Sequence, residues 1–161
     1  MGLNWFYEKI TTIISVYMNF TQSVSTCFKK YLDFKGRASR SEFWYFFLFY
    51  IIASFVAGWL IGSFVALLGG SVNVLLVVLS VVFIALFIPA LSVTVRRFHD
   101  FGVSGWMYCA FIVPYVISGF IEDAQPLLAG IIKLGTLVIF FVYVSQKPSK
   151  GKNKFGSVPK K

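Results

Sequence analysis

Two long uncharged stretches determine the architecture that this sequence predicts. Residues 43–68 and residues 72–95 contain no charged side chain. About 20 helical residues cross the roughly 30 Å hydrocarbon layer of a bilayer, and each stretch exceeds that length. Both stretches are therefore predicted to be membrane-spanning helices.

Two shorter apolar stretches follow, at residues 106–121 and 127–144, and the polar segment 122–126 between them predicts a helical hairpin. Lipid admits only helices and closed barrels, and these stretches lack the alternation of barrel strands. The predicted fold is an all-α membrane protein. Its domain, residues 31–145, is a four-transmembrane-helix bundle with helices at about 43–68, 72–95, 106–121 and 127–144.

Residues 1–30 show a different pattern, in which apolar side chains from Trp5 to Phe28 recur at mostly helical spacing between polar and basic ones. This pattern is typical of an amphipathic helix. Such a segment can lie in the plane of the lipid headgroups, pack under the bundle, or bind a partner helix, and its aromatic-rich apolar side favours the first.

The positive charges lie outside the apolar stretches, with Lys133 as the exception. The turns at 69–71 and 122–126 contain no Lys or Arg. The other three connecting or terminal segments carry Lys9, Lys29, Lys30, Lys35, Arg37 and Arg40, then Arg96 and Arg97, then Lys147, Lys150, Lys152, Lys154, Lys160 and Lys161. The positive-inside rule places these segments in the cytoplasm. Both termini are thus predicted to be cytoplasmic, with residues 146–161 as a basic tail.

Composition excludes several classes of protein. With 58% hydrophobic and 13% charged residues, the chain is too apolar for a soluble domain. The net charge of +9 reflects topology and attraction to anionic lipid, and we expect no nucleic-acid binding because no soluble basic domain remains. A single histidine and the absence of a C-x-x-C motif predict no metal site and no cofactor. Cys27 and Cys109 are expected to be free thiols.

A first polar cluster precedes the first predicted helix. Ser39 and Glu42 have the spacing of a capping box, in which a hydroxyl and a carboxylate bind the free amides at a helix start. Capping leaves Arg37 and Arg40 unexplained. We expect Glu42 to pair with Arg37, Arg96 or Arg97 at the inner membrane boundary.

A second polar cluster, Arg96 to Trp106, is predicted to link the second and third helices. Its arginines complement a helix C-terminus, and Gly102 permits a tight turn. His99 beside Asp100 is interpreted as a structural pair rather than a catalytic one. The predicted topology places this cluster and the first one at the same face of the membrane.

The clustered cations Arg37, Arg40, Arg96 and Arg97 are all arginine, whereas the basic tail contains only lysine. A guanidinium can donate two hydrogen bonds at once to a phosphate or carboxylate, while lysine acts as a point charge. The cluster is therefore predicted to bind an anionic lipid headgroup or an acidic partner segment. His99 could add charge near neutral pH.

Lys133 is the one charge inside a predicted span. It lies about 9 Å from the outer start of its helix, so its side chain can extend outward towards Glu122 or Asp123. A role in a solute pathway is the alternative, because ionisable groups inside membranes are often functional.

Three strings of residues, 34–44, 96–106 and 151–156, resemble the three signatures of the bacterial inner-membrane family called domain of unknown function 805. The resemblance spans about residues 31–159 and departs from the family at Phe98, where an aliphatic side chain is expected. It implies the fold and a multi-pass protein of the bacterial inner membrane. It implies no activity, since the family has none established.

Three functions remain. The leading prediction is a non-enzymatic protein whose basic cytoplasmic face binds anionic lipid or a membrane-protein partner. The second is a small transporter or channel component, a homo-oligomer that uses Lys133. The third is a lipid enzyme with His99 and Asp100 as acid and base, which lacks any recognisable catalytic motif.

Overall fold

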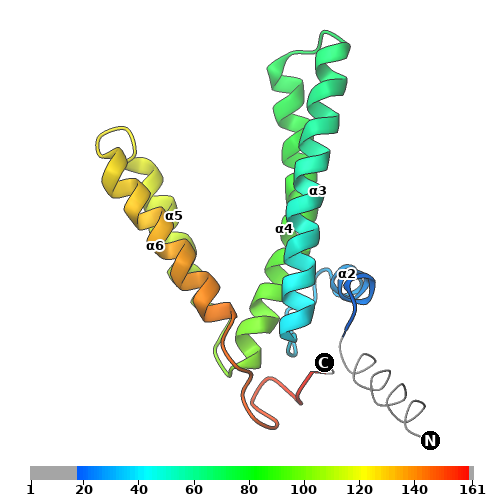
Figure 1. Ribbon diagram of the computed structural model, residues 1–161, viewed down its shortest axis with the longest axis vertical. Helices are drawn as coiled ribbons and strands as arrows, with labels where there is room; N and C mark the ends of the chain where they lie inside the picture. The colour runs from blue at the N-terminus through cyan, green and yellow to red at the C-terminus, as the bar shows by residue number, and fades with distance from the viewer. Residues whose placement is uncertain (1–17, 160–161) are drawn as a thin grey trace, which may run out of the picture. The chain divides into compact units, whose positions relative to one another are not determined.

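The structure is a computed structural model that describes residues 18–159, and Figure 1 shows its helices. They are α2 (Phe20–Lys29), α3 (Arg40–Leu67), α4 (Val72–Asp100), α5 (Met107–Phe120) and α6 (Pro126–Val144). The described range contains no strand beyond one isolated bridge between Asn153 and Gly156. The all-α class is therefore confirmed.

Three helices, α3, α4 and α6, are long and apolar enough to cross a membrane. Helix α5 has 14 residues, or about 21 Å at 1.5 Å per residue, which is shorter than the hydrocarbon layer. Three of the four predicted helices are thus long and apolar enough to span the membrane, and the count of four spanning helices stays a prediction.

Helix α4 is longer than the sequence pattern predicts. Its apolar stretch ends at Val95, but the helix continues to Asp100, so residues 96–100 are helical rather than part of a loop. The expectation of a loop was wrong because these residues contain no glycine or proline that would end the helix.

The chain divides into two compact units, and each is described by itself. In the first unit, α3 and α4 run in opposite directions from a short turn, residues 68–71 (Figure 1). Helix α2 starts with a capping box between Asn19 and Gln22 and packs on α3 through Phe28, whose ring contacts those of Phe46 and Phe49 at 5.8 and 5.6 Å. Residues 20–29 therefore pack against α3. Residues 1–17 of the amphipathic segment lie outside the described residues.

The second unit contains residues 35–40 and 94–159. Helices α5 and α6 pack as the predicted hairpin, and at its turn the ammonium group of Lys133 lies 2.6 Å from a Glu122 carboxylate oxygen. At the other end, fully buried Phe98 contacts Phe101, Phe111, Phe140 and Tyr143, with centroid distances of 5.6 to 6.3 Å. A phenylalanine at position 98 thus joins the last turns of α4 to the α5–α6 hairpin.

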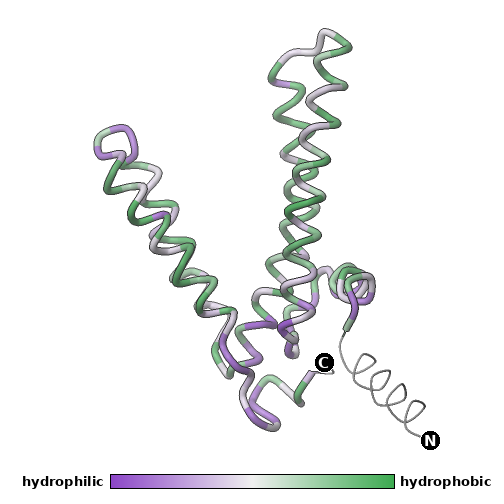
Figure 2. The backbone as a smooth tube through the Cα atoms, viewed as in Figure 1, coloured by the Kyte–Doolittle hydropathy of each residue, from purple (hydrophilic) through white to green (hydrophobic). Residues whose placement is uncertain are grey.

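Large apolar side chains remain exposed along α3, α4, α5 and α6. Examples are Phe55 in α3, Ile84 in α4, Ile117 in α5 and Val142 in α6. Figure 2 shows hydrophobic residues along these helices and hydrophilic ones at the α5–α6 turn, in the segment before α3 and in the basic tail. Side chains exposed in this way need an apolar surrounding, which a bilayer supplies.

Candidate functional site

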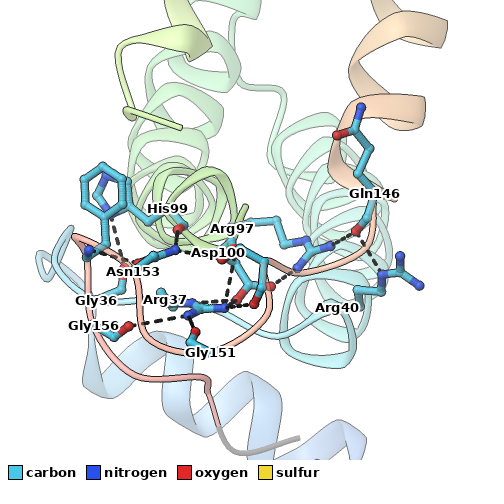
Figure 3. A network of polar contacts seen from close by, with 12 residues as sticks. Gly36, Arg37, Arg40, Arg97, His99, Asp100, Gln146, Gly151, Asn153 and Gly156 are labelled. Atoms are coloured by element: carbon cyan, nitrogen blue, oxygen red, sulfur yellow. Dashed lines mark hydrogen bonds and ion pairs between the residues drawn. The ribbon is translucent and has the colours of Figure 1, made fainter. Parts of the chain in front are cut away.

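Arg37 lies in the loop before α3 and is buried, with its side chain 1% exposed. Its guanidinium has five N–H donors, and each of them has an acceptor. Nε donates to the Asp100 carboxylate at 2.8 Å, and Nη1 donates to the carbonyls of Gly151 and Gly156 at 2.7 and 3.4 Å. Nη2 donates to the carbonyls of Asp100 and Ser149 at 3.2 and 3.0 Å. The geometry of the guanidinium, and not only its charge, is therefore used here (Figure 3).

Asp100, the last residue of α4, binds two guanidinium groups with its buried carboxylate. One oxygen accepts from Arg37, and the other accepts a short hydrogen bond from Arg97, which lies three residues earlier on the same helix. Arg97 also donates to the carbonyls of Val144 at 2.9 Å and Gln146 at 2.5 Å. Arg97 thus joins the end of α4 to the end of α6, where its charge complements both helix dipoles.

The end of α4 has the hydrogen bonds of a Schellman motif. The Gly102 amide donates to the His99 carbonyl at 3.0 Å, and the Val103 amide donates to the Phe98 carbonyl at 3.1 Å. Gly102 has a φ of 83°, which favours glycine. Gly105 has no such φ, but a Cβ atom there would lie 2.6 Å from the Val95 side chain. The two glycines let the chain turn tightly from α4 into α5. The start of α5 has Trp106 at the N-cap position, without a side-chain cap.

The basic tail folds back on the end of α4. We call residues 149–156 the clasp. The amide and hydroxyl of Ser149 donate to the Asp100 carbonyl at 3.0 and 2.8 Å, and the Asn153 amide group donates to the His99 carbonyl at 2.8 Å. Asn153 and Gly156 exchange two backbone hydrogen bonds of 3.0 Å, which close the clasp on itself. The clasp therefore binds the last carbonyls of α4 and supplies most of the acceptors around Arg37.

His99 is held on two sides. Its Nδ1 lies 3.1 Å from the Gly36 carbonyl, and because a carbonyl only accepts, Nδ1 carries the proton. Its ring stacks on that of Phe155 in the clasp, with the centroids 3.8 Å apart. The Lys154 ammonium group in turn lies 5.0 Å from the centroid of the Phe155 ring. These contacts describe a structural histidine; a change of its charge near neutral pH stays a prediction.

The remaining residues of the two clusters take different positions. Ser39 precedes the first residue of α3 and Glu42 follows three positions later, which are the positions of a capping box; the capping bonds themselves stay a prediction. Buried Glu42 lies 3.9 Å from the Cys27 thiol, and its pairing with an arginine also stays a prediction. Cys27 and Cys109 form no disulfide bond within residues 18–159, as the sequence predicts. Arg96 is fully buried, and its carbonyl accepts from the Ala38 amide at 3.0 Å.

Arg40 differs from the other arginines because it is exposed. Within residues 18–159, its guanidinium donates from Nε to the Gln146 carbonyl at 3.0 Å. Figure 3 shows its two Nη atoms pointing away from the rest of the network. The structure therefore brings together Arg37, Arg40, Arg97, His99 and Asp100. It leaves the Nη1 and Nη2 groups of Arg40, which we call its fork, facing outward.

The network can do little acid–base chemistry. The Asp100 carboxylate is occupied by two guanidinium groups, and His99 donates to a backbone carbonyl. No group of His, Cys, Asp and Glu side chains within residues 18–159 could hold a metal ion. The network carries net positive charge. The acidic residues of the described second unit are Asp100, Glu122 and Asp123, and the last two lie in the α5–α6 turn at the opposite end.

Comparison with known proteins gives a consistent result. Residues 31–157 match the family described as protein of unknown function (DUF805). Inner membrane protein YhaH of Escherichia coli strain K12 is 31% identical over 132 residues, which cover 82% of this chain and 91% of that protein. Inner membrane protein YhaI of the same strain is 29% identical over 133 residues, which cover 82% of this chain and 90% of that protein. No solved structure matches the chain significantly.

Proposed function

This chain belongs to the DUF805 family, and we propose that it is a non-enzymatic inner-membrane protein whose cytoplasmic face binds the headgroups of anionic lipids. Its relatives YhaH and YhaI are named inner membrane proteins, and three of its helices are long and apolar enough to span a bilayer. The observation that carries the lipid-binding proposal is the folded clasp, because it gathers exposed cations around a buried polar network.

In the proposed topology, α3, α4, α5 and α6 all cross the membrane and both termini are cytoplasmic. Helix α5 packs along α6. If α5 did not cross the membrane, the polar turn at residues 121–125 would lie inside the hydrocarbon, where its backbone groups could not be satisfied. The charges support this orientation. The charged residues of the α5–α6 turn are both acidic, whereas the opposite end of the hairpin carries cations.

The basic face consists of exposed Arg40 and the exposed lysines of the tail. These lysines are Lys147, Lys150, Lys152 and Lys154. In a free tail the lysines would be spread along a mobile chain, whereas the clasp holds residues 149–156 against the end of α4. Each cation near an anionic surface contributes about 1 kcal/mol of attraction. Their concentration at one end favours an anionic membrane surface as the ligand.

The same geometry assigns a supporting role to the buried arginines. All donors of Arg37 are used inside the protein, and fully buried Arg97 donates from Nε, Nη1 and Nη2 to internal acceptors. A headgroup could reach these groups only if the network opened. We therefore assign lipid contact to the basic face, and the positioning of that face to Arg37, Arg97 and Asp100.

The alternative of a small transporter or channel component depends on Lys133. This residue is paired with Glu122 near the α5–α6 turn, and the pairing accounts for a charge at that depth. No contact of the described residues favours a solute pathway over this structural role.

Lipid selectivity tests the proposal. The purified protein would be mixed with equal amounts of phosphatidylglycerol and phosphatidylethanolamine, and retained lipids would be counted by native mass spectrometry. We expect preferential retention of phosphatidylglycerol, lost when Lys147, Lys150, Lys152 and Lys154 are all replaced by glutamine. Lys133→Gln is the matched control, since it removes a positive charge at the opposite end. Equal retention of both lipids by the wild-type protein would refute the proposal.

A further inference from the structure

The outward-facing fork of Arg40 is held in place by one backbone carbonyl. The oxygen of Gln146 accepts from Arg40 Nε at 3.0 Å and from Arg97 Nη2 at 2.5 Å. Since Arg97 is fully buried and bound to Asp100 and Val144, that carbonyl has a fixed position. Tethering through Nε leaves the opposite edge of the Arg40 guanidinium, formed by Nη1 and Nη2, directed outward (Figure 3).

The local charge makes this edge attractive to an anion. Arg37 and Arg97 share the carboxylate of Asp100, while Arg40, among residues 18–159, contacts only the partial negative charge of a carbonyl. Two guanidinium groups on one carbonyl repel each other, and the repulsion is strongest where one of them is removed from water. Exposed Lys147 follows Gln146 directly and adds positive charge. An anion at the Arg40 edge would offset this excess.

We propose that the Nη1–Nη2 edge of Arg40, assisted by Lys147, is a binding site for a phosphate group. Two parallel N–H donors match two phosphate oxygens, and a charge-assisted pair of this kind is both stronger and more directional than a point charge. The inference deepens the proposed function, on which it rests for the source of the phosphate, a lipid headgroup at the membrane surface. Free inorganic phosphate has the same chemistry and is the other possible source.

This assignment differs from binding by charge alone in a way that can be measured. Replacing Arg40 by lysine keeps the charge but removes the fork, and it leaves every hydrogen bond of Arg37 and Arg97 in place. The matched variant Lys133→Arg also keeps the charge, and it lies beside Glu122, outside the proposed site. In native mass spectra we expect Arg40→Lys to weaken phosphatidylglycerol binding about tenfold, the effect of losing one charge-assisted hydrogen bond. We expect Lys133→Arg to bind as the wild type does.

Two arms separate this inference from the function on which it rests. If the wild type prefers phosphatidylglycerol and the four-lysine variant loses that preference, but Arg40→Lys binds normally, the proposed function stands and the fork site is refuted. The second arm titrates lipid-free protein with inorganic phosphate, followed by ³¹P line broadening. Broadening that Arg40→Lys abolishes, without any lipid preference, would keep the fork site with free phosphate as its ligand. If the wild-type protein shows neither a lipid preference nor line broadening, both proposals are refuted.

Discussion

Replacing Asp100 with asparagine tests the network most directly. The substitution preserves the shape of the side chain and removes its charge. In the wild-type protein both carboxylate oxygens of Asp100 bind guanidinium groups, and the side chain is 1% exposed. In the variant, the new NH2 group would face a donor of Arg37 or Arg97, and neither guanidinium can accept a hydrogen bond. Two buried positive charges would remain close together without their counter-ion.

Removing one partner from a buried ion pair costs about 3–5 kcal/mol. Because Asp100 serves two guanidinium groups, we expect a loss in this range. The loss should fall on the clasp rather than on the helices, since the clasp holds Arg37 through the carbonyls of Ser149, Gly151 and Gly156. A tenfold change in an equilibrium constant corresponds to about 1.4 kcal/mol, so the opening of the clasp should become roughly two to four orders of magnitude more frequent.

Amide hydrogen exchange measures this opening locally. The amides of Ser149, Asn153 and Gly156 donate hydrogen bonds to the Asp100, Gly156 and Asn153 carbonyls and should be protected in the wild type. In Asp100→Asn they should exchange faster by the stated factor, or until protection is lost. The amides of α3 should keep their wild-type rates, which shows that the protein is still folded.

Asp123→Asn is the control, because this exposed carboxylate lies in the α5–α6 turn. It removes the same charge and should leave exchange in the clasp unchanged. Wild-type protection of the clasp amides in Asp100→Asn would refute the reasoning, since the carboxylate would then contribute nothing to holding the tail.

Three further predictions concern other parts of the chain. Gly102→Ala forces an alanine into a φ of 83° and should destabilise the protein by about 1–2 kcal/mol, measured by thermal unfolding in detergent; an unchanged melting temperature would contradict the turn geometry. Lys133→Met breaks a partly exposed pair with Glu122, so stability should change by no more than about 1 kcal/mol and solute flux in proteoliposomes should not change; a large loss of flux would favour the transport alternative. Reporter fusions at Lys161 and after Asp123 should report opposite compartments, with activity of the Lys161 fusion on the outer side as the contradicting result.

The helices could be predicted because their causes are local. Uncharged stretches, polar turns and one-sided loop charges are all visible along the chain, and the α3, α4 and α6 boundaries near the apolar stretches follow from them. The same local signals placed Lys133 within reach of Glu122. They failed at residues 96–100, because polarity marks the end of an apolar surface and a helix can continue past it to the next glycine.

The clasp could not be predicted from side-chain patterns. Its contacts to Arg37 are backbone carbonyls, which every residue has, and its lysines suggested a solvated tail. Two signals were present in the sequence. Asn153 and Gly156 are turn residues inside the third signature string, and an arginine whose five donors need acceptors requires more than one aspartate. The sequence indicated the clustering of Arg37, Arg97 and Asp100, but not what surrounds them.

The clasp also has a consequence for the order in which the protein is completed during synthesis. The carbonyls of Gly151 and Gly156 leave the ribosome more than a hundred residues after Arg37, whose guanidinium they accept from. Helices α3 to α6 are then already made, while Arg37 still lacks its three acceptors in the clasp and the last turn of α4 has open carbonyls. A chain that stops before Ser149 would contain helices α3 to α6 and an unfinished polar end. Closure of the clasp therefore distinguishes a chain that includes residues 149–156 from one that stops before them.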